Sequence, residues 1–283
     1  MMRAATKGPT LKWPGAKWTE QVIGPIVERF PPHRCYVSLF FGSGADLIHK
    51  APAACEVVND LDDDVVNFFE VLRDTPAELA EVVSLTPWSR REWELAKRHD
   101  DDPGKLERAR RFVAHMNQSH GQRPGCTGWR HDGPARTSSV TLQWHSLPDR
   151  IVHTAERMRR VQIECRPALD LLTRYAGADV LVFADPPYLG TVRKGRKIYR
   201  REMMAAAEHE DLLTGLRAHP GMVSLTHYRC PLYDEMLSDW TVIELAAVAE
   251  HGQPRVEGLY LNPELVQRLH VSRRQLQLLG GSA

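Results

Sequence analysis

The tetrapeptide Asp185-Pro186-Pro187-Tyr188 constrains the fold more than any other part of the chain. It follows the apolar run 180–184, which is short and bounded and therefore predicts a buried parallel strand. Two prolines cannot continue a strand ladder or lie inside a helix, so the chain must turn where the strand ends. Open α/β sheets bind ligands at that end of their strands. A simple proline turn is the structural alternative, but the complete tetrapeptide favours a functional carboxylate and ring.

Two earlier predicted strands also end in residues suited to a ligand. Residues 35–40 predict a strand that runs directly into Phe41-Gly42-Ser43-Gly44. Glycines in such a turn let the backbone approach a ligand, and a following helix offers free N–H groups. Residues 54–59 predict the second strand, and Asp60 after it is placed to accept hydrogen bonds from a ribose diol. Together these features indicate a nucleoside-bearing cofactor.

The rest of the chain predicts an α/β fold with one unusual stretch. Helices are expected over 19–30, 65–72, 147–160, 168–175, 203–218 and 233–237, and strands over 161–165 and 222–226. Residues 241–247 and 256–261 are close enough in sequence to form an antiparallel pair. Between about 76 and 148 the sequence is rich in tryptophan, glycine and proline, which indicates an insertion.

Basic residues gather in that insertion and again after Tyr188. Between Lys105 and Arg136, seven basic residues face two acidic ones. A solvated charged face is the alternative, but basic residues mixed with aromatics and amides are typical of phosphate and base-edge contacts. The candidates for nucleic-acid contact are Arg108, Arg111, Asn117, Gln118, Arg123 and Arg130 in the insertion, and Arg193, Lys194, Arg196 and Lys197 beyond the tetrapeptide.

Composition indicates a soluble cytoplasmic protein. The 283 residues carry a formal net charge of +1, so a nucleic-acid surface must come from local clustering. The five cysteines show no close pairing, which favours a reducing compartment. No apolar run approaches the roughly 20 residues of a membrane span. His115, His120, Cys126 and His131 could be imagined as zinc ligands, but their spacing matches no familiar set, so no metal is expected.

Taken in order, four segments make a recognisable pattern: Leu11-Lys12-Trp13-Pro14-Gly15-Ala16-Lys17, residues 40–44, residues 59–61 and the tetrapeptide. The chain resembles the Dam-like N6-adenine-specific DNA methyltransferases. The resemblance implies a Rossmann-like sheet, mostly parallel with an antiparallel last strand. It implies a catalytic domain formed by 1–75 and 149–283, with an inserted, mostly helical target-recognition domain at 76–148. It also implies S-adenosylmethionine as cofactor and double-stranded DNA as partner.

The resemblance also implies roles for individual residues. Asp185 and the Pro186 carbonyl would accept hydrogen bonds from the target amine, with Pro187 completing the rigid turn and Tyr188 stacking on a flipped-out adenine. Trp13 and Lys17 would belong to a loop that covers the cofactor. The other expected cofactor contacts are Phe40, Gly42, Gly44, Asp60 and Asp185.

Three positions depart from the family pattern. Ser38 and Pro167 stand where acids are usual, and Ala16 stands where the covering loop usually has glycine. Losing one polar contact would weaken cofactor binding by about 0.5–1.5 kcal/mol. The alternatives are an N6-adenine RNA methyltransferase, a protein glutamine methyltransferase (which prefers Asn before Pro-Pro-Tyr), and a catalytically weak protein that binds cofactor and DNA. The sequence predicts a monomer or weak dimer, and it leaves open the recognition sequence and whether a cognate restriction endonuclease exists.

Overall fold

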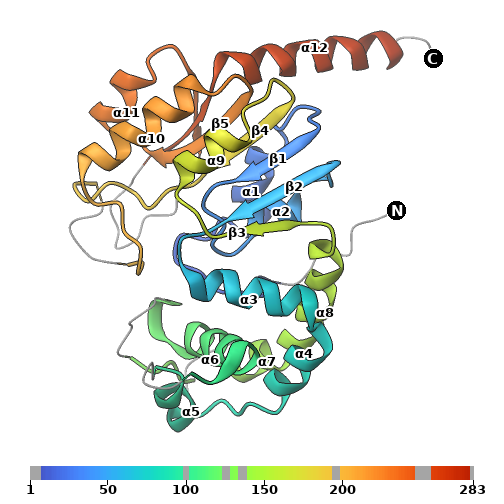
Figure 1. The fold of residues 1–283 in the computed structure, drawn as a ribbon, viewed down its shortest axis with the longest axis vertical. Coiled ribbons are helices and arrows are strands. Elements are labelled where there is room, and N and C mark those ends of the chain that lie inside the picture. Colours follow the sequence, from blue (N-terminus) through green and yellow to red (C-terminus); the bar gives the residue numbers. More distant parts are fainter. Residues whose placement is uncertain are drawn as a thin grey trace.

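The computed structural model describes residues 8–97, 102–122, 128–132, 139–192, 198–245 and 256–280. A seven-stranded sheet runs through the centre (Figure 1), and five of its strands are parallel. In spatial order the strands are β3 (Gln162–Glu164), β2 (Cys55–Asn59), β1 (Cys35–Ser38), β4 (Val180–Ala184), β5 (Met222–Tyr228), β7 (Glu257–Leu261) and β6 (Thr241–Leu245). The predicted pair at the end of the chain is confirmed, since β7 is antiparallel to both β5 and β6. The α/β fold class with a mostly parallel sheet is therefore correct.

The register of the central strands brings the predicted site together. Ser38 is paired with Val58 on one side and with Phe183 on the other. Positions two residues further along, Phe40, Asp60 and Asp185, therefore emerge side by side at the carboxyl edge of the sheet.

Helices cover both faces of the sheet because alternate residues of its buried strands point to opposite sides. One apolar core includes Tyr36 and Val58 and packs against α1 (Glu20–Val27), α2 (Ala45–His49) and α3 (Asp63–Asp74). The other core includes Val37 and Val57. It packs against α9 (Ala168–Arg174), α10 (Ala206–Ala218) and α11 (Pro231–Met236).

The expected insertion is mostly helical over its described residues. It contains α4 (Pro76–Ser84), α5 (Arg90–Leu95), α6 (Gly104–Gln118), the short 3₁₀ helix η1 (His120–Gln122) and α7 (Val140–His145), and α8 (Leu147–Met158) follows it. In Figure 1, α4, α5, α6 and α7 lie on the side of α3 that faces away from the sheet. The ring of Phe68 on α3 lies 6.4 Å from that of Phe112 on α6, and both belong to the first apolar core. The helices of the insertion thus pack directly on the sheet's own helical layer.

The chain continues past the sheet in one helix that the sequence analysis did not anticipate, α12 (Pro263–Gly280). Asn262 links it to the sheet, because its Oδ1 accepts hydrogen bonds from the backbone N–H groups of Leu265 (3.0 Å) and Val223 (2.9 Å). None of the described helices, α12 included, is both long and apolar enough to cross a membrane.

Candidate active site

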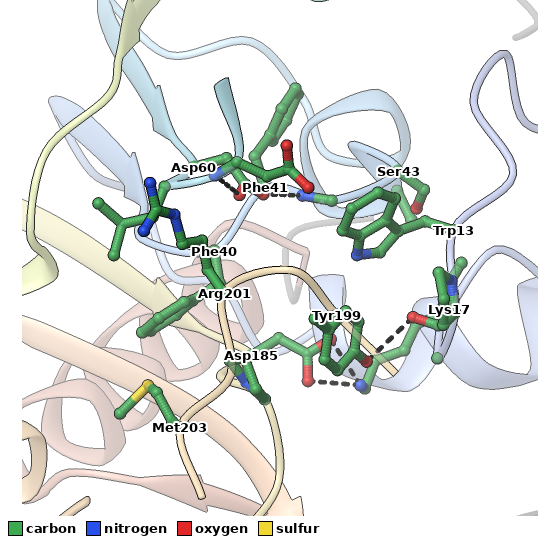
Figure 2. A pocket seen from close by; sticks show the side chains of 18 of the residues that line it. Trp13, Lys17, Phe40, Phe41, Ser43, Asp60, Asp185, Tyr199, Arg201 and Met203 are labelled. Atoms are coloured by element: carbon green, nitrogen blue, oxygen red, sulfur yellow. Dashed lines mark hydrogen bonds and ion pairs between the residues drawn. The ribbon is translucent and has the colours of Figure 1, made fainter. Parts of the chain in front are cut away.

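A cavity of about 340 Å³ opens at the carboxyl edge of the parallel strands. Its walls come from the loop 13–17, the glycine turn, the end of β2, the start of the tetrapeptide and the segment 199–203. Asp185 and Lys17 meet on one side of it, and Asp60 lies away from them (Figure 2). Segments far apart in the sequence therefore converge where the sequence analysis expected them.

The glycine turn is shaped by a carboxylate and an aromatic ring. Gly42 has φ = +50°, and its N–H donates to Asp60 Oδ2 at 2.9 Å. The other oxygen of Asp60 accepts from the Asp62 N–H, also at 2.9 Å. A Cβ atom at Gly42 would lie 2.6 Å from Trp13 Cδ1, so the indole occupies the space that only glycine leaves free. Gly44 (φ = +74°) shapes the turn against Phe41 instead of lining the cavity.

Buried acids give the cavity a negative character. Burial raises the pKa of Asp60 to about 6, although the backbone N–H donors oppose the shift. Asp46 on α2 also lines the cavity and is buried, and it was not expected from the sequence. Its carboxylate accepts a hydrogen bond from Tyr36 Oη at 2.6 Å, and burial raises its pKa. A ligand that carries a positive charge or hydroxyl donors suits such a lining.

Asp185 is held in a network of hydrogen bonds. Lys17 Nζ donates to both carboxylate oxygens of Asp185 at 2.7 Å, and Thr226 Oγ1 donates to Oδ1 at 2.8 Å. Burial raises the pKa of Asp185, and the ammonium of Lys17 opposes that rise. Burial lowers the pKa of Lys17, but the carboxylates of Asp185 and Glu257 outweigh it and raise that pKa overall. Lys17 was expected beside the cofactor, and the structure adds a direct contact with the proposed catalytic carboxylate.

Tyr188 lies behind Asp185 and outside the cavity lining. Its hydroxyl donates to Glu257, and its oxygen accepts a hydrogen bond from Lys17 at 3.0 Å. The Tyr188 ring packs against His227 and Tyr228, with both centroids 4.7 Å away. The structure therefore brings Asp185 and Pro187, but not Tyr188, to the cavity that contains the glycine turn.

A second aromatic residue joins Trp13 over the cavity. The ring of Tyr199 lies 5.9 Å from that of Trp13, and its hydroxyl donates to the Pro14 carbonyl at 3.1 Å. Arg201 and Met203 continue this wall (Figure 2). The sequence analysis did not identify Tyr199 or Met203, although an aromatic side chain within a basic run after the tetrapeptide was an available signal.

Two of the predicted DNA contacts are engaged in ion pairs. Arg108 contacts Asp63 and Asp64, each at 2.7 Å, and joins α6 to the start of α3. Arg111 donates to Glu107 at 2.8 Å within α6. A phosphate would have to compete with these carboxylates, so the structure offers an intramolecular role for both arginines.

Asn117 and Gln118 require a correction, because both are buried. Asn117 Nδ2 donates to the Val113 carbonyl at 2.9 Å, and Gln118 Nε2 donates to the Pro87 carbonyl at 3.1 Å. Asn117 thus bonds back to its own helix and Gln118 joins α6 to the segment before α5, so both amides are engaged within the protein interior. The positions of these residues in the sequence do not by themselves distinguish a buried amide from an exposed one.

Of the remaining DNA candidates only Arg130 is described, and its backbone N–H donates to the Gln118 carbonyl at 2.7 Å. Arg123, Arg193, Lys194, Arg196 and Lys197 lie outside the described residues. Cys126 does too, and within the described residues no cluster of three or more His, Cys, Asp or Glu could hold a metal ion.

The three departures from the family pattern have different settings. Asp46, which lies beside Ser38, places a carboxylate in the wall of the cavity. Ala16 lies in a turn in which its N–H donates to the Trp13 carbonyl at 3.2 Å. Pro167 precedes α9 and does not line the cavity.

One family model matches part of the chain. Residues 13–111 match the family model described as D12 class N6 adenine-specific DNA methyltransferase. The matched region contains the loop 13–17, the glycine turn and Asp60, and it ends before Asp185. No curated protein matches the chain. A solved structure of a conserved hypothetical protein from Streptococcus pyogenes is 12% identical with a TM-score of 0.36, and the alignment covers 86% of this chain and 94% of that one.

Proposed function

We propose that the chain, whose residues 13–111 match the D12 class of N6 adenine-specific DNA methyltransferases, methylates the N6 amine of adenine at a specific site in double-stranded DNA. The observation that carries the proposal is one cavity that contains both the glycine turn and Asp185. Such a cavity can hold a methyl donor directly beside a carboxylate that binds the accepting amine.

The cavity lining fits S-adenosylmethionine, on which this family generally depends. Its volume lies in the range of small-molecule sites. Gly42 leaves its backbone open to a ligand, and Asp60 can accept hydrogen bonds from ribose hydroxyls in addition to its two backbone donors. Trp13 and Phe40 provide apolar surface for the adenine ring of the cofactor. When bound, S-adenosylmethionine supplies an electrophilic methyl group on a sulfonium.

Asp185 would prepare the accepting nitrogen. The exocyclic amine of adenine is a weak nucleophile because its lone pair is delocalised into the ring. A carboxylate that accepts a hydrogen bond from this amine favours a tetrahedral nitrogen with a localised lone pair. Pro186 and Pro187 restrict the backbone next to that carboxylate. Positioning and preorganised electrostatics would thus account for most of the rate enhancement.

Access to this nitrogen requires a base outside the duplex. The target atom cannot be reached within the base stack, so we propose that the adenine rotates into the site and stacks on Tyr188. The contacts of Tyr188 with His227, Tyr228 and Glu257 would hold its ring ready for that role. We further propose that the helices of 76–148 act as the target-recognition domain, with Arg130 and the basic residues of 193–197 near the DNA.

The proposal is tested by measuring N6-methyladenine in DNA from a methylase-free host that expresses the chain. Nucleoside digests are compared for wild type, Asp185→Ala and Asp211→Ala, the last being an exposed acid of α10 that serves as a matched control. We expect the modified base with wild type and Asp211→Ala, and none with Asp185→Ala. Sequencing of the same DNA then gives the recognition site.

Other outcomes would identify the alternatives. The modified base in RNA but not in DNA would replace the proposal by RNA methylation. Binding of S-adenosylmethionine without any methylated nucleic acid would instead indicate a binding protein.

A further inference from the structure

A second carboxylate, Glu257, shares the ammonium of Lys17 with Asp185. Lys17 lies 3.0 Å from Glu257 Oε1, compared with 2.7 Å from each oxygen of Asp185. The side chains of Lys17 and Glu257 are only 7% and 11% exposed. Two carboxylates, that of Asp185 on a side chain 23% exposed, therefore crowd around one ammonium. Such an arrangement costs folding free energy, so it calls for a functional explanation.

The antiparallel strand explains why Glu257 lies here. It is the first residue of β7, and it pairs with Tyr228, the last residue of β5. Because β7 runs opposite to the parallel strands, its beginning lies at the edge where those strands end. A parallel strand in the same place would present its last residues there instead.

A new donor to Asp185 would compete with Lys17 for the charge of the carboxylate. Its Oδ1 already accepts hydrogen bonds from Lys17 and Thr226, whereas its Oδ2 accepts only from Lys17 and keeps a lone pair for another donor. If the target amine donates to Oδ2, it shares that oxygen with Lys17, and the contact with Lys17 weakens. A buried ammonium that lost its carboxylate would be strongly disfavoured. Glu257 removes this difficulty, since it already lies within hydrogen-bond distance of Lys17.

We propose that Glu257 is a positioning residue that retains Lys17 when Asp185 turns to the amine of the target base. The ammonium moves its main contact from Asp185 to Glu257 and stays inside the cluster. The same carboxylate accepts the Tyr188 hydroxyl hydrogen bond, so it also orients the ring on which the base would stack. This inference rests on the proposed function, because it concerns the entry of the base into that site.

The test is steady-state kinetics of Glu257→Gln on duplex DNA that contains the recognition site. Gln keeps the size of the side chain and removes its charge, so Lys17 becomes committed to Asp185. We expect kcat to fall at least about 10-fold, while the dissociation constant of S-adenosylmethionine, measured by calorimetry, changes less than about 2-fold, since Glu257 does not line the cavity. Equal kcat values for Glu257→Gln and wild type would overturn the inference.

The pH profile separates positioning from a general loss of structure. The groups around Asp185 are Lys17, Glu257, Tyr188 and Thr226, with His227 behind the Tyr188 ring. Glu257 raises the pKa of Asp185 by like-charge repulsion. In Glu257→Gln the acid limb of kcat/KM should therefore move to lower pH. An unmoved limb with a uniformly lower rate would mean that Glu257 is merely structural, and the inference would fail.

Two further comparisons make the result decisive. Glu257→Asp keeps the charge, and we expect it to retain the wild-type position of the acid limb with a smaller loss of kcat; a limb displaced as in Glu257→Gln would contradict the inference. In a Lys17→Met background, Glu257→Gln should lower kcat less than about 3-fold, because its partner is gone. If Glu257→Gln lowered kcat as much in the Lys17→Met background as in the wild type, Glu257 would not act through Lys17. A wild-type protein that methylates no DNA would refute the proposed function itself, whereas active wild type with normal Glu257→Gln refutes only this inference.

Discussion

Replacing Gly42 by Ala should damage the cofactor site more than the fold. Gly42 has φ = +50°, and the added Cβ would lie 2.6 Å from Trp13 Cδ1 and 2.9 Å from Trp13 Nε1. A left-handed conformation costs a non-glycine residue about 1–2 kcal/mol. Overpacking of a filled site typically adds about 1–3 kcal/mol unless the neighbour moves away. Trp13 lies in a loop over the cavity, so we expect it to move and relieve most of the clash.

Two other glycines provide matched controls for these contributions. Gly104 has φ = +78° with no atom within 4 Å of an added Cβ, so Gly104→Ala measures backbone strain alone. Gly44 has φ = +74° and does not line the cavity, but its Cβ would lie 2.7 Å from the ring of Phe41, which does. Gly44→Ala therefore combines backbone strain with a clash against a side chain of the cavity wall.

The assays are chemical unfolding and calorimetric titration of S-adenosylmethionine. We expect Gly104→Ala to lower the free energy of unfolding by about 1–2 kcal/mol without changing cofactor affinity. Gly42→Ala should show a similar loss of stability together with about 3- to 10-fold weaker cofactor binding, from the lost aromatic contact of about 0.5–1.5 kcal/mol. If Gly42→Ala matched Gly104→Ala in both measurements, the argued role of the turn against Trp13 would be wrong.

Two further predictions concern the buried acids of the cavity. Cofactor affinity should fall as the pH drops below about 6, because Asp60 then binds a proton that the ribose hydroxyls must displace. Asp60→Asn should remove this pH dependence, whereas Asp63→Asn should keep it. A wild-type affinity that does not change with pH would contradict this prediction. The free energy of unfolding should change in the opposite direction: it should rise as the pH drops below about 6, because protonation of Asp60 favours the folded state. Asp46→Asn should weaken the binding of S-adenosylhomocysteine about 10- to 100-fold, as expected for the loss of a hydrogen bond to a charged group. The binding of 5′-methylthioadenosine, which lacks the amino-acid moiety, should not change. Equal weakening of both ligands in calorimetric titrations would exclude a contact between Asp46 and the ammonium group of the ligand.

The site residues that the sequence placed at one edge of the sheet follow strands whose ends are defined locally. Apolar runs predicted β1, β2 and β4, and parallel strands place their carboxyl ends at one edge. The positions of the glycine turn, Asp60 and Asp185 at one edge therefore followed from the order of the elements. Their register, in which Ser38 lies between Val58 and Phe183, needed only that these strands pair without a shift.

The residues that the sequence missed depend on pairing across long distances in the chain. The position of Glu257 follows from the register between β7 and β5, and a shift of one residue would turn its side chain to the other face. The burial of Asn117 and Gln118 follows from the packing of α5 and the Trp129 segment against the end of α6. No local pattern specifies these contacts, because each depends on how separate elements pack.

The charge balance around Asp185 follows from two opposing requirements. An ionised carboxylate is a stronger acceptor for the amine than a protonated one, yet burial and the nearby Glu257 both raise the pKa of Asp185. The ammonium of Lys17 opposes that rise in pKa, but at 2.7 Å it also contacts both oxygens, one of which the amine would share. Removing Lys17 would free those oxygens and at the same time raise the pKa of Asp185 further. Both requirements are met when the ammonium stays within the cluster and shifts towards Glu257, which already lies within hydrogen-bond distance of it.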